Sequence, residues 1–136
     1  MSKSAIYTVN DTNTAVATEN QQFVTVPFGT VIRRFGPNLQ LNGDGIQANG
    51  CGYYTFNVSL TLLPTEVGEI SAQLYLNGEP IQGAIATGYA ATAGNPVNLT
   101  LNPMIRLFSC KGTGTVTCGV NASCTVPNFA TEGEKK

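Results

Sequence analysis

The segment from Cys51 to Pro64, CGYYTFNVSLTLLP, alternates apolar and polar side chains almost without interruption. Successive side chains of a β-strand point to opposite faces of a sheet, so this period of two predicts one long strand with one buried face. The other face is polar yet uncharged, which favours contact with protein over contact with water alone. We expect the buried face to hold Tyr54, Phe56, Val58, Leu60 and Leu62, and the presented face to hold Tyr53, Thr55, Asn57, Ser59 and Thr61.

Shorter segments with the same alternation recur along the chain, separated by turn signals. One of these signals is Asn77-Gly78, a dipeptide typical of tight hairpins because both residues tolerate a positive φ angle. No window has the 3.6-residue period of a helix. The sequence therefore predicts an all-β sandwich or barrel of about ten antiparallel strands. The expected strands cover residues 5–9, 22–28, 30–35, 39–41, 46–48, 52–63, 70–76, 81–89, 97–108, 115–120 and 128–134.

The composition limits the possible partners. Charged residues make up only 11% of the 136-residue chain, against roughly 25% in an ordinary soluble domain. The net charge of −1 gives no basic excess for nucleic acid or for an anionic membrane. The N-terminal residues lack the apolar core of a signal peptide, and no stretch approaches the roughly 20 apolar residues of a membrane span. We therefore expect neither a nucleic acid nor a membrane as partner.

The residues needed for most enzyme chemistry are missing. The chain has no histidine, which excludes Ser-His-Asp and Cys-His systems and the usual imidazole base. Glu66 and Glu69 form the only carboxylate pair in mid-chain, and they flank a turn that is expected to be a solvated hairpin tip. Asp11, Asp44 and Glu79 do not form the dense carboxylate loop that calcium prefers. We expect a non-enzymatic protein with no catalytic residue, no metal site and no cofactor.

The four cysteines match neither a zinc ribbon nor a redox Cys-x-x-Cys pair. They are Cys51, Cys110, Cys118 and Cys124. The simplest expectation is free thiols, with Cys118 pointing inward from a strand and packing as a small apolar residue. A disulfide among Cys110, Cys118 and Cys124 is the alternative.

Two stretches carry a resemblance to a known family. GYYTFNVSL followed by EISAQLYLNGEPIQGA resembles the central strands of C1q/TNF-like jelly rolls. The segments 26–36, VPFGTVIRRFG, and 39–54, LQLNGDGIQANGCGYY, are similar to small proteins and C-terminal domains of Firmicutes and their phages. This similarity covers about residues 4–135.

The resemblance implies a single jelly-roll domain over residues 1–136, with about ten antiparallel strands, that assembles as a compact homotrimer. Residues 1–20 would partly form an N-terminal arm, and residues 132–136 an exposed C-terminal tail. Similar proteins cap collagen-like filaments on spores or belong to phage particles, and this chain has no Gly-X-Y repeat. The residues expected at the trimer interface are Tyr53, Thr55, Asn57, Ser59, Gln73 and Tyr75.

Two functional hypotheses follow. The first is a structural protein, a homotrimeric knob that decorates a phage capsid as a decoration or head-fibre protein. Its partners would be its own copies and a major capsid protein or another virion component, at the virion surface. The alternative is a C1q-like carbohydrate- or receptor-binding module on a phage tail, spore or cell surface, where Tyr75 and Tyr89 would stack on a surface glycan.

Overall fold

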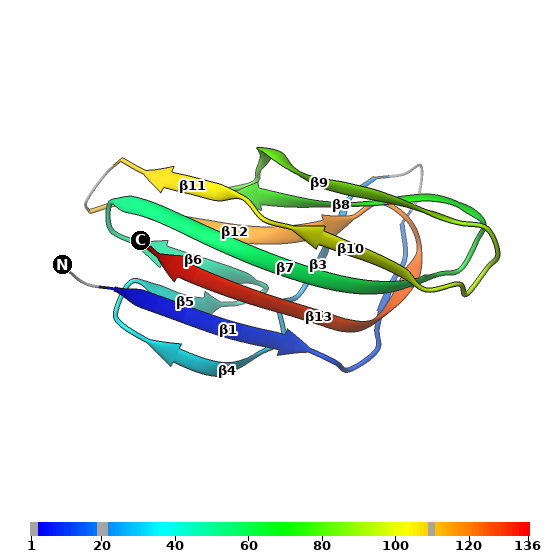
Figure 1. Cartoon of the computed structure of the whole chain (residues 1–136), viewed down its shortest axis with the longest axis horizontal. Helices are drawn as coiled ribbons and strands as arrows, with labels where there is room; N and C mark the ends of the chain where they lie inside the picture. The colour runs from blue at the N-terminus through cyan, green and yellow to red at the C-terminus, as the bar shows by residue number, and fades with distance from the viewer. Residues whose placement is uncertain (1–2, 19–21, 109–110) are drawn as a thin grey trace.

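The computed structural model of the chain describes residues 3–18, 22–108 and 111–136. Within these ranges all regular structure is β-strand, arranged as two antiparallel sheets that pack face to face (Figure 1). This is the all-β sandwich that the alternating segments predict. Both ends of the described chain lie at the same end of the long axis (Figure 1).

The first sheet, called sheet A, contains the long strand that dominates the sequence. Its strands follow the order β10-β7-β13-β1-β4, with β11 also paired to β7 and β2 also paired to β13. Sheet A therefore has β7 and β13 at its centre and β4 at a free edge. The bounds are β1 Ser4–Asn10, β2 Thr14–Val16, β4 Thr30–Phe35, β7 Gly52–Pro64, β10 Val97–Leu101, β11 Met104–Leu107 and β13 Cys124–Lys135.

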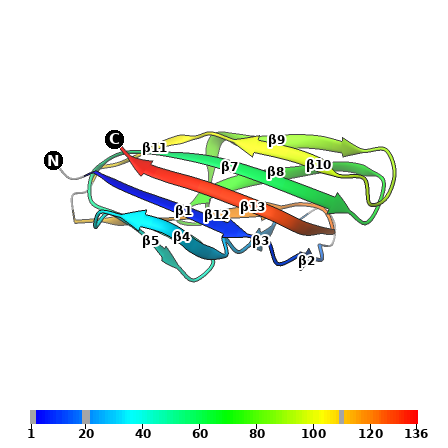
Figure 2. The same cartoon turned by 60° about the horizontal axis from the view of Figure 1, so that its bottom comes forward.

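The second sheet, called sheet B, follows the order β5-β6-β12-β8-β9, with β3 also paired to β12. The strand β9 of sheet B contacts β10 of sheet A, so the two sheets meet along one edge (Figure 2). The opposite edge is formed by β4 and β5. The bounds are β3 Val24–Val26, β5 Leu39–Asn42, β6 Gly45–Asn49, β8 Gly68–Leu76, β9 Glu79–Ala90 and β12 Thr113–Val120.

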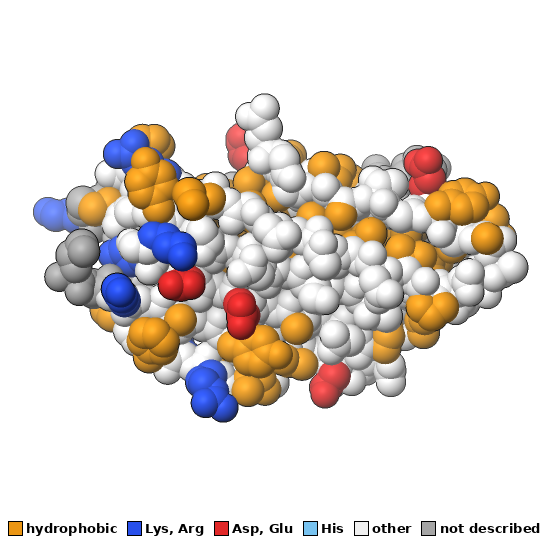
Figure 3. Space-filling model, in the orientation of Figure 1, with side chains coloured by type: hydrophobic (Ala, Val, Ile, Leu, Met, Phe, Trp, Pro, Cys, Tyr) orange, Lys and Arg blue, Asp and Glu red, His pale blue; other side chains and the backbone are white. Residues whose placement is uncertain are grey.

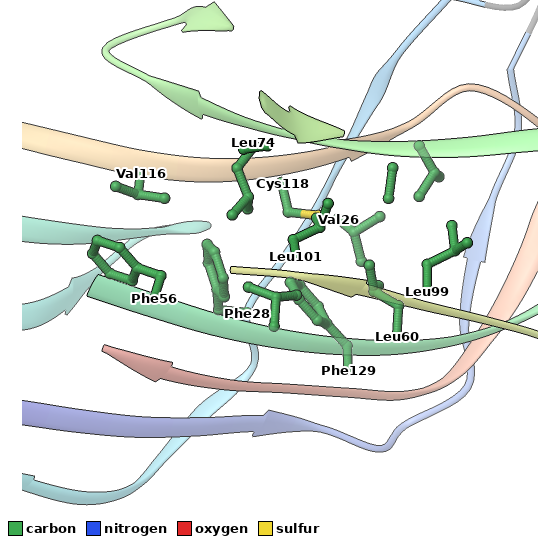
Figure 4. Packing of buried hydrophobic residues seen from close by; sticks show 14 of the residues in the cluster. Val26, Phe28, Phe56, Leu60, Leu74, Leu99, Leu101, Val116, Cys118 and Phe129 are labelled. Carbon is green, nitrogen blue, oxygen red and sulfur yellow. The ribbon is translucent and has the colours of Figure 1, made fainter. Parts of the chain in front are cut away.

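The core lies between the sheets and is made by the inward face of each strand. In Figure 4, Phe56 and Leu60 of β7 lie on the side of the strand that faces Val116 and Cys118 of β12. The rings of Phe28 and Phe129 lie 4.9 Å apart between centroids and are tilted by 32°. All five residues expected on the inward face of β7 are buried, which confirms the face assignment made from the sequence.

The strand boundaries differ from the sequence prediction in three places. The expected loop before residue 20 contains the short strand β2, which pairs with the first residues of β13. The expected strand 97–108 is divided into β10 and β11 around Pro103, which has no amide hydrogen to donate to the ladder. The last strand begins at Cys124 and not at Asn128, because a register shift between Thr125 and Asn128 accommodates Pro127.

The expected C-terminal tail over residues 132–136 is also corrected. Residues 132–135 belong to β13 and pair with both β1 and β7. Gly133 is buried between Phe56 and Ile6, where a β-carbon would lie 2.9 Å from the Phe56 ring. Residues 4–10 form β1, which pairs with β13 on one side and β4 on the other, so this part of the N-terminal segment belongs to the sandwich.

The hairpin between β8 and β9 forms where the sequence predicts it. Asn77 and Gly78 both have positive φ angles, of 53° and 82°. Two consecutive positive φ angles match the right-handed twist of the paired strands. The Asn77 side chain also accepts a hydrogen bond from the backbone amide of Thr115 at 3.0 Å, which ties the hairpin to β12.

Candidate interaction surface

Sheet A has seven strands and sheet B six, so sheet A has the larger outward face by strand number. On β7, the outward side chains of Tyr53, Asn57 and Ser59 are exposed, and that of Thr55 is half-buried. The space-filling view of this face shows mainly uncharged polar side chains over its middle (Figure 3). Four of the six expected interface residues therefore lie together on one face.

Two shallow hollows cross this face and share a common wall. One has a volume of about 200 Å³ and the other about 370 Å³. Both are lined by Tyr7 of β1, Asn57 of β7 and Glu132 of β13. The sequence analysis missed Tyr7, although its outward position follows from the alternation of residues 5–9.

The face is less neutral than β7 alone suggests. Glu132 and Glu134 point outward from β13, next to β7 in the sheet. On the far side of β1, Arg33 of β4 lies opposite Tyr7. Arg34 lies opposite the buried Ile6, so the two arginines point to opposite sides of the sheet, as a strand requires.

The two remaining interface candidates lie on sheet B, away from the other four. Gln73 has only 8% of its surface exposed, and its side-chain amide donates to the carbonyl oxygens of Leu74, Ile81 and Ala84 at 3.0, 3.0 and 3.1 Å. A register shift between β8 and β9 makes room for this arrangement. Gln73 is therefore a buried structural residue, and its place among outward-facing interface residues is corrected.

The two tyrosines expected to stack on a ligand differ in accessibility. Tyr75 is half-buried and meets Phe23 edge to face, with ring centroids 6.1 Å apart. Burial also raises the pKa of the Tyr75 phenol. Tyr89 is 65% exposed on the edge strand β9, where it pairs with Glu69. Only Tyr89 offers an open ring face.

A polar hollow of about 300 Å³ lies at the loop end of the sandwich. It is lined by Glu66 and Glu69 together with Thr18, Asn121 and Ser123 and neighbouring residues. The two glutamates are exposed at the β7–β8 turn, as expected for a hairpin tip.

The expectation of free thiols is confirmed for Cys124 and for Cys118, which packs in the core, and is wrong for Cys51. Cys51 takes part in a disulfide, whereas Cys118 and Cys124 are free and buried. Cys110 lies outside the described residues. Burial raises the pKa of the Cys118 thiol to about 12 and that of Cys124 to about 11, so both are poor nucleophiles at neutral pH.

The chemistry of the described residues offers no clustered site. No group of three or more His, Cys, Asp or Glu side chains in these ranges could hold a metal ion. Asp11, Asp44 and Glu79 lie in three separate turns or strand ends. Within the same ranges, no helix has the length and apolar character needed to cross a membrane.

Comparisons with known proteins identify the fold class. No protein-family model matches the chain, and no curated protein sequence matches it. Solved structures do match over nearly the whole chain. Murine APRIL superposes with a TM-score of 0.71 at 12% identity, covering 98% of this chain and 99% of that chain.

Two further solved structures extend the range of similar proteins. The PRD1 vertex protein P5 matches with a TM-score of 0.65 at 12% identity, covering 98% of this chain and 96% of its own. The globular domain of zebrafish complement 1qA matches with a TM-score of 0.57 at 13% identity, covering 95% and 94%. The fold is therefore a C1q/TNF-like jelly roll, as the resemblance in the sequence implies.

Proposed function

We propose that the chain is a non-enzymatic structural protein that assembles as a homotrimer and decorates a phage capsid. The observation that carries this proposal is the outward face of sheet A, which is broad, hollowed and poor in charge at β7. Interface centres are depleted of Lys, Glu and Asp and enriched in tyrosine. Tyr53, Thr55, Asn57 and Ser59 are the proposed interface residues on this face.

A closed ring needs a second, different patch on each copy, because a heterologous interface joins two unlike surfaces. The edge strand β9 supplies one. Ile85 is 51% exposed there and Tyr89 65% exposed, and both point outward from sheet B. We propose that this apolar edge fills the hollows beside Tyr7 and Asn57 on the next copy. Three such contacts close a ring in which both patches of every copy are covered.

The role at a capsid rests on two further supports. The sequence resemblance includes phage structural proteins, and one similar fold is a vertex protein. A capsid component must associate with other protein through its surface, and it requires no catalytic groups. The sequence has no histidine, the residue that provides the commonest catalytic acid or base.

The interface is tested with a matched pair of charge insertions. Ser59→Arg places a cation in the middle of the proposed interface, and Gln40→Arg places one on the exposed face of β5 in sheet B. Size-exclusion chromatography with light scattering should show that Ser59→Arg is monomeric and Gln40→Arg is trimeric. A wild-type mass that neither variant changes would remove sheet A from the interface.

The capsid role is tested on purified particles from the phage or prophage that carries this sequence. Quantitative mass spectrometry should find the protein at a fixed ratio to the major capsid protein, in a multiple of three copies. A particle without the protein would refute the role in decoration.

A second function is favoured by the exposure of Tyr89. Its ring lies on the same face as Glu69, which lines the polar hollow at the loop end. Sugar sites commonly combine an aromatic platform with polar groups. A glycan array should then show binding that Tyr89→Ala removes and that Tyr75→Ala, in the partly covered position, leaves in place. A glycan array without any bound sugar would refute this second function.

A further inference from the structure

The cations of this molecule gather at one end of its long axis, although the net charge of the chain is only −1. Figure 3 shows the Lys and Arg side chains of the viewed face concentrated toward the end where both termini lie in Figure 1. The opposite end carries Asp11 after β1 and Glu66 and Glu69 after β7. The end beside the chain termini is therefore richer in cations, although Glu79, Glu132 and Glu134 lie toward it as well.

Strand register explains how cations distant in sequence come together. Lys135 lies opposite Tyr54 at the start of β7, and Arg106 lies opposite Tyr53. The backbone amide of Lys136 donates to the Tyr53 carbonyl oxygen at 2.8 Å. Each of these residues is thus fixed at the same end of β7.

The remaining cations join through neighbouring strands. Lys3 immediately precedes Ser4, which pairs with Lys135. Arg34 of the edge strand β4 pairs with Ile6 of β1, two residues after Ser4. Lys111 adjoins Gly112, whose carbonyl accepts a hydrogen bond from Gly50, just before β7. We call the six residues the basic end: Lys3, Arg34, Arg106, Lys111, Lys135 and Lys136.

Few of these cations have a side-chain partner among the described residues, although Nε of Arg34 donates a hydrogen bond to the Leu39 carbonyl oxygen. The described residues contain a single ion pair, between Lys136 and Glu134 at 3.9 Å, and both side chains are more than half exposed. Lys135 is half-buried, and the other members of the basic end are exposed. An exposed pair of this kind contributes little to stability. The basic end thus retains most of its capacity to attract an anion.

Arg106 is held in a fixed position by two aromatic rings. Its guanidinium carbon lies 5.3 Å from the Tyr53 ring centroid and 4.5 Å from the Phe108 ring centroid. A guanidinium that stacks on rings keeps its edge N–H groups free, and this planar fork matches a carboxylate. Because the rings pre-order the side chain, less entropy is lost when an anion binds.

Large apolar side chains lie among the cations. Phe108 is 78% exposed, Met104 60% and Phe35 61%. Protein interfaces are enriched in aromatic residues, methionine and arginine. The net charge of −1 gives the chain no basic excess for nucleic acid, whereas a folded acidic partner would bury these side chains. The combination therefore favours an acidic protein surface over nucleic acid.

We propose that the basic end is a docking surface for an acidic protein surface, which places carboxylates on the six cations and covers Met104 and Phe108. This inference rests on the proposed function in one respect: if the chain is a capsid component, the basic end is the surface through which it attaches. Trimer formation through sheet A would cover Tyr53 and the hollow that Arg34 and Phe35 help to line, so in the trimer the other five cations of the basic end stay open to the partner. Three basic ends on one trimer would bind a repeating acidic lattice with avidity.

The test uses the full chain and immobilised poly-L-glutamate as the probe. We expect retention at low ionic strength and release as salt screens the charges, at a few tenths molar. The triple variant Arg106→Gln/Lys135→Gln/Lys136→Gln should lose at least tenfold in apparent affinity. Arg106→Lys keeps the charge but not the planar fork, and should lose less than Arg106→Gln.

Arg33→Gln is the matched control, because it removes one cation from outside the basic end; it is compared with wild type at equal oligomeric mass, since Arg33 lines one hollow of the proposed trimer interface. It should stay within twofold of wild type, and an equal loss in Arg33→Gln and Arg106→Gln would overturn the proposal. Absence of retention, or tighter retention on duplex DNA of equal charge, would also overturn it. Light scattering on the same samples separates the two proposals: a monomer that binds refutes only the trimer, and a trimer that does not bind refutes only the docking surface.

Discussion

Thr8 and Thr131 lie directly opposite each other across β1 and β13, and both hydroxyl groups are buried without a hydrogen-bond partner among the described residues. The pair points into the core from the centre of sheet A. A buried hydroxyl without a partner costs free energy relative to an apolar group of the same shape. The pair therefore destabilises the fold, whereas the buried polar side chains of Ser4 and Asn10 on β1 are hydrogen-bonded.

Thr131→Val should raise the free energy of unfolding by about 1 kcal/mol, because valine keeps the shape and removes the unsatisfied hydroxyl. Chemical denaturation with a constant m-value measures the change. Thr14→Val is the matched control, since the Thr14 hydroxyl accepts a hydrogen bond from the Asn10 side-chain amide at 3.0 Å and its loss should destabilise. Destabilisation by Thr131→Val would contradict the prediction.

The free energy of unfolding should fall at alkaline pH, in part because the Cys118 thiol ionises more readily in the unfolded chain. Burial raises the pKa of this thiol from 9.0 to about 12, so the folded chain holds the proton more tightly than the unfolded chain. The stabilisation linked to the Cys118 proton is fully present below about pH 9. It is lost as pH rises toward 12, by about 1.4 kcal/mol of unfolding free energy per pH unit. Denaturation of wild type and Cys118→Ala between pH 9 and 11 measures it. Equal slopes in the two proteins would contradict the prediction.

Gln73→Leu should destabilise the chain by about 1–3 kcal/mol, because three carbonyl oxygens lose their donor inside the fold. The exposed Gln40→Leu serves as the control, with an expected change within about 0.5 kcal/mol. Amide hydrogen exchange should also rise in the 81–85 segment, which Gln73 holds against β8. Unchanged exchange in that segment would show that the amide does not hold the irregular register.

Gly88 marks a close approach between the two sheets at the β9–β10 edge. A β-carbon at Gly88 would lie 2.4 Å from Cγ1 of Val97. Gly88→Ala should therefore cost about 1–3 kcal/mol through overpacking. The double variant Gly88→Ala/Val97→Ala should recover part of this loss, since the second change removes the clashing methyl group. Additive losses would argue that the two residues do not touch.

Alternation within one strand predicted most of the fold. The 13-residue strand β7 and its inward face were correct because a period of two determines both at once. The same rule failed for Gln73, because alternation in β8 carries no information about the register shift in β9. It also missed the first part of β13, where a three-residue pairing with β2 overrides a loop-like sequence containing Pro127.

The candidate surfaces depend on contacts that no local pattern contains. The common face of the four proposed interface residues on β7 could be predicted because they share one strand. The basic end could not, since its members are spread from Lys3 to Lys136 and meet only through pairing of β1, β11 and β13 with their neighbours. The disulfide at Cys51 was missed for the same reason, because the spacing of cysteines does not give their separation in space.

The central claim is that identical copies cover the outward face of sheet A. Sedimentation equilibrium of the wild-type chain over a hundredfold range of concentration tests it most directly. The proposed trimer predicts a mass three times the 14.3 kDa of the chain, constant on dilution above its dissociation constant. A mass of 14.3 kDa at every concentration would contradict the claim.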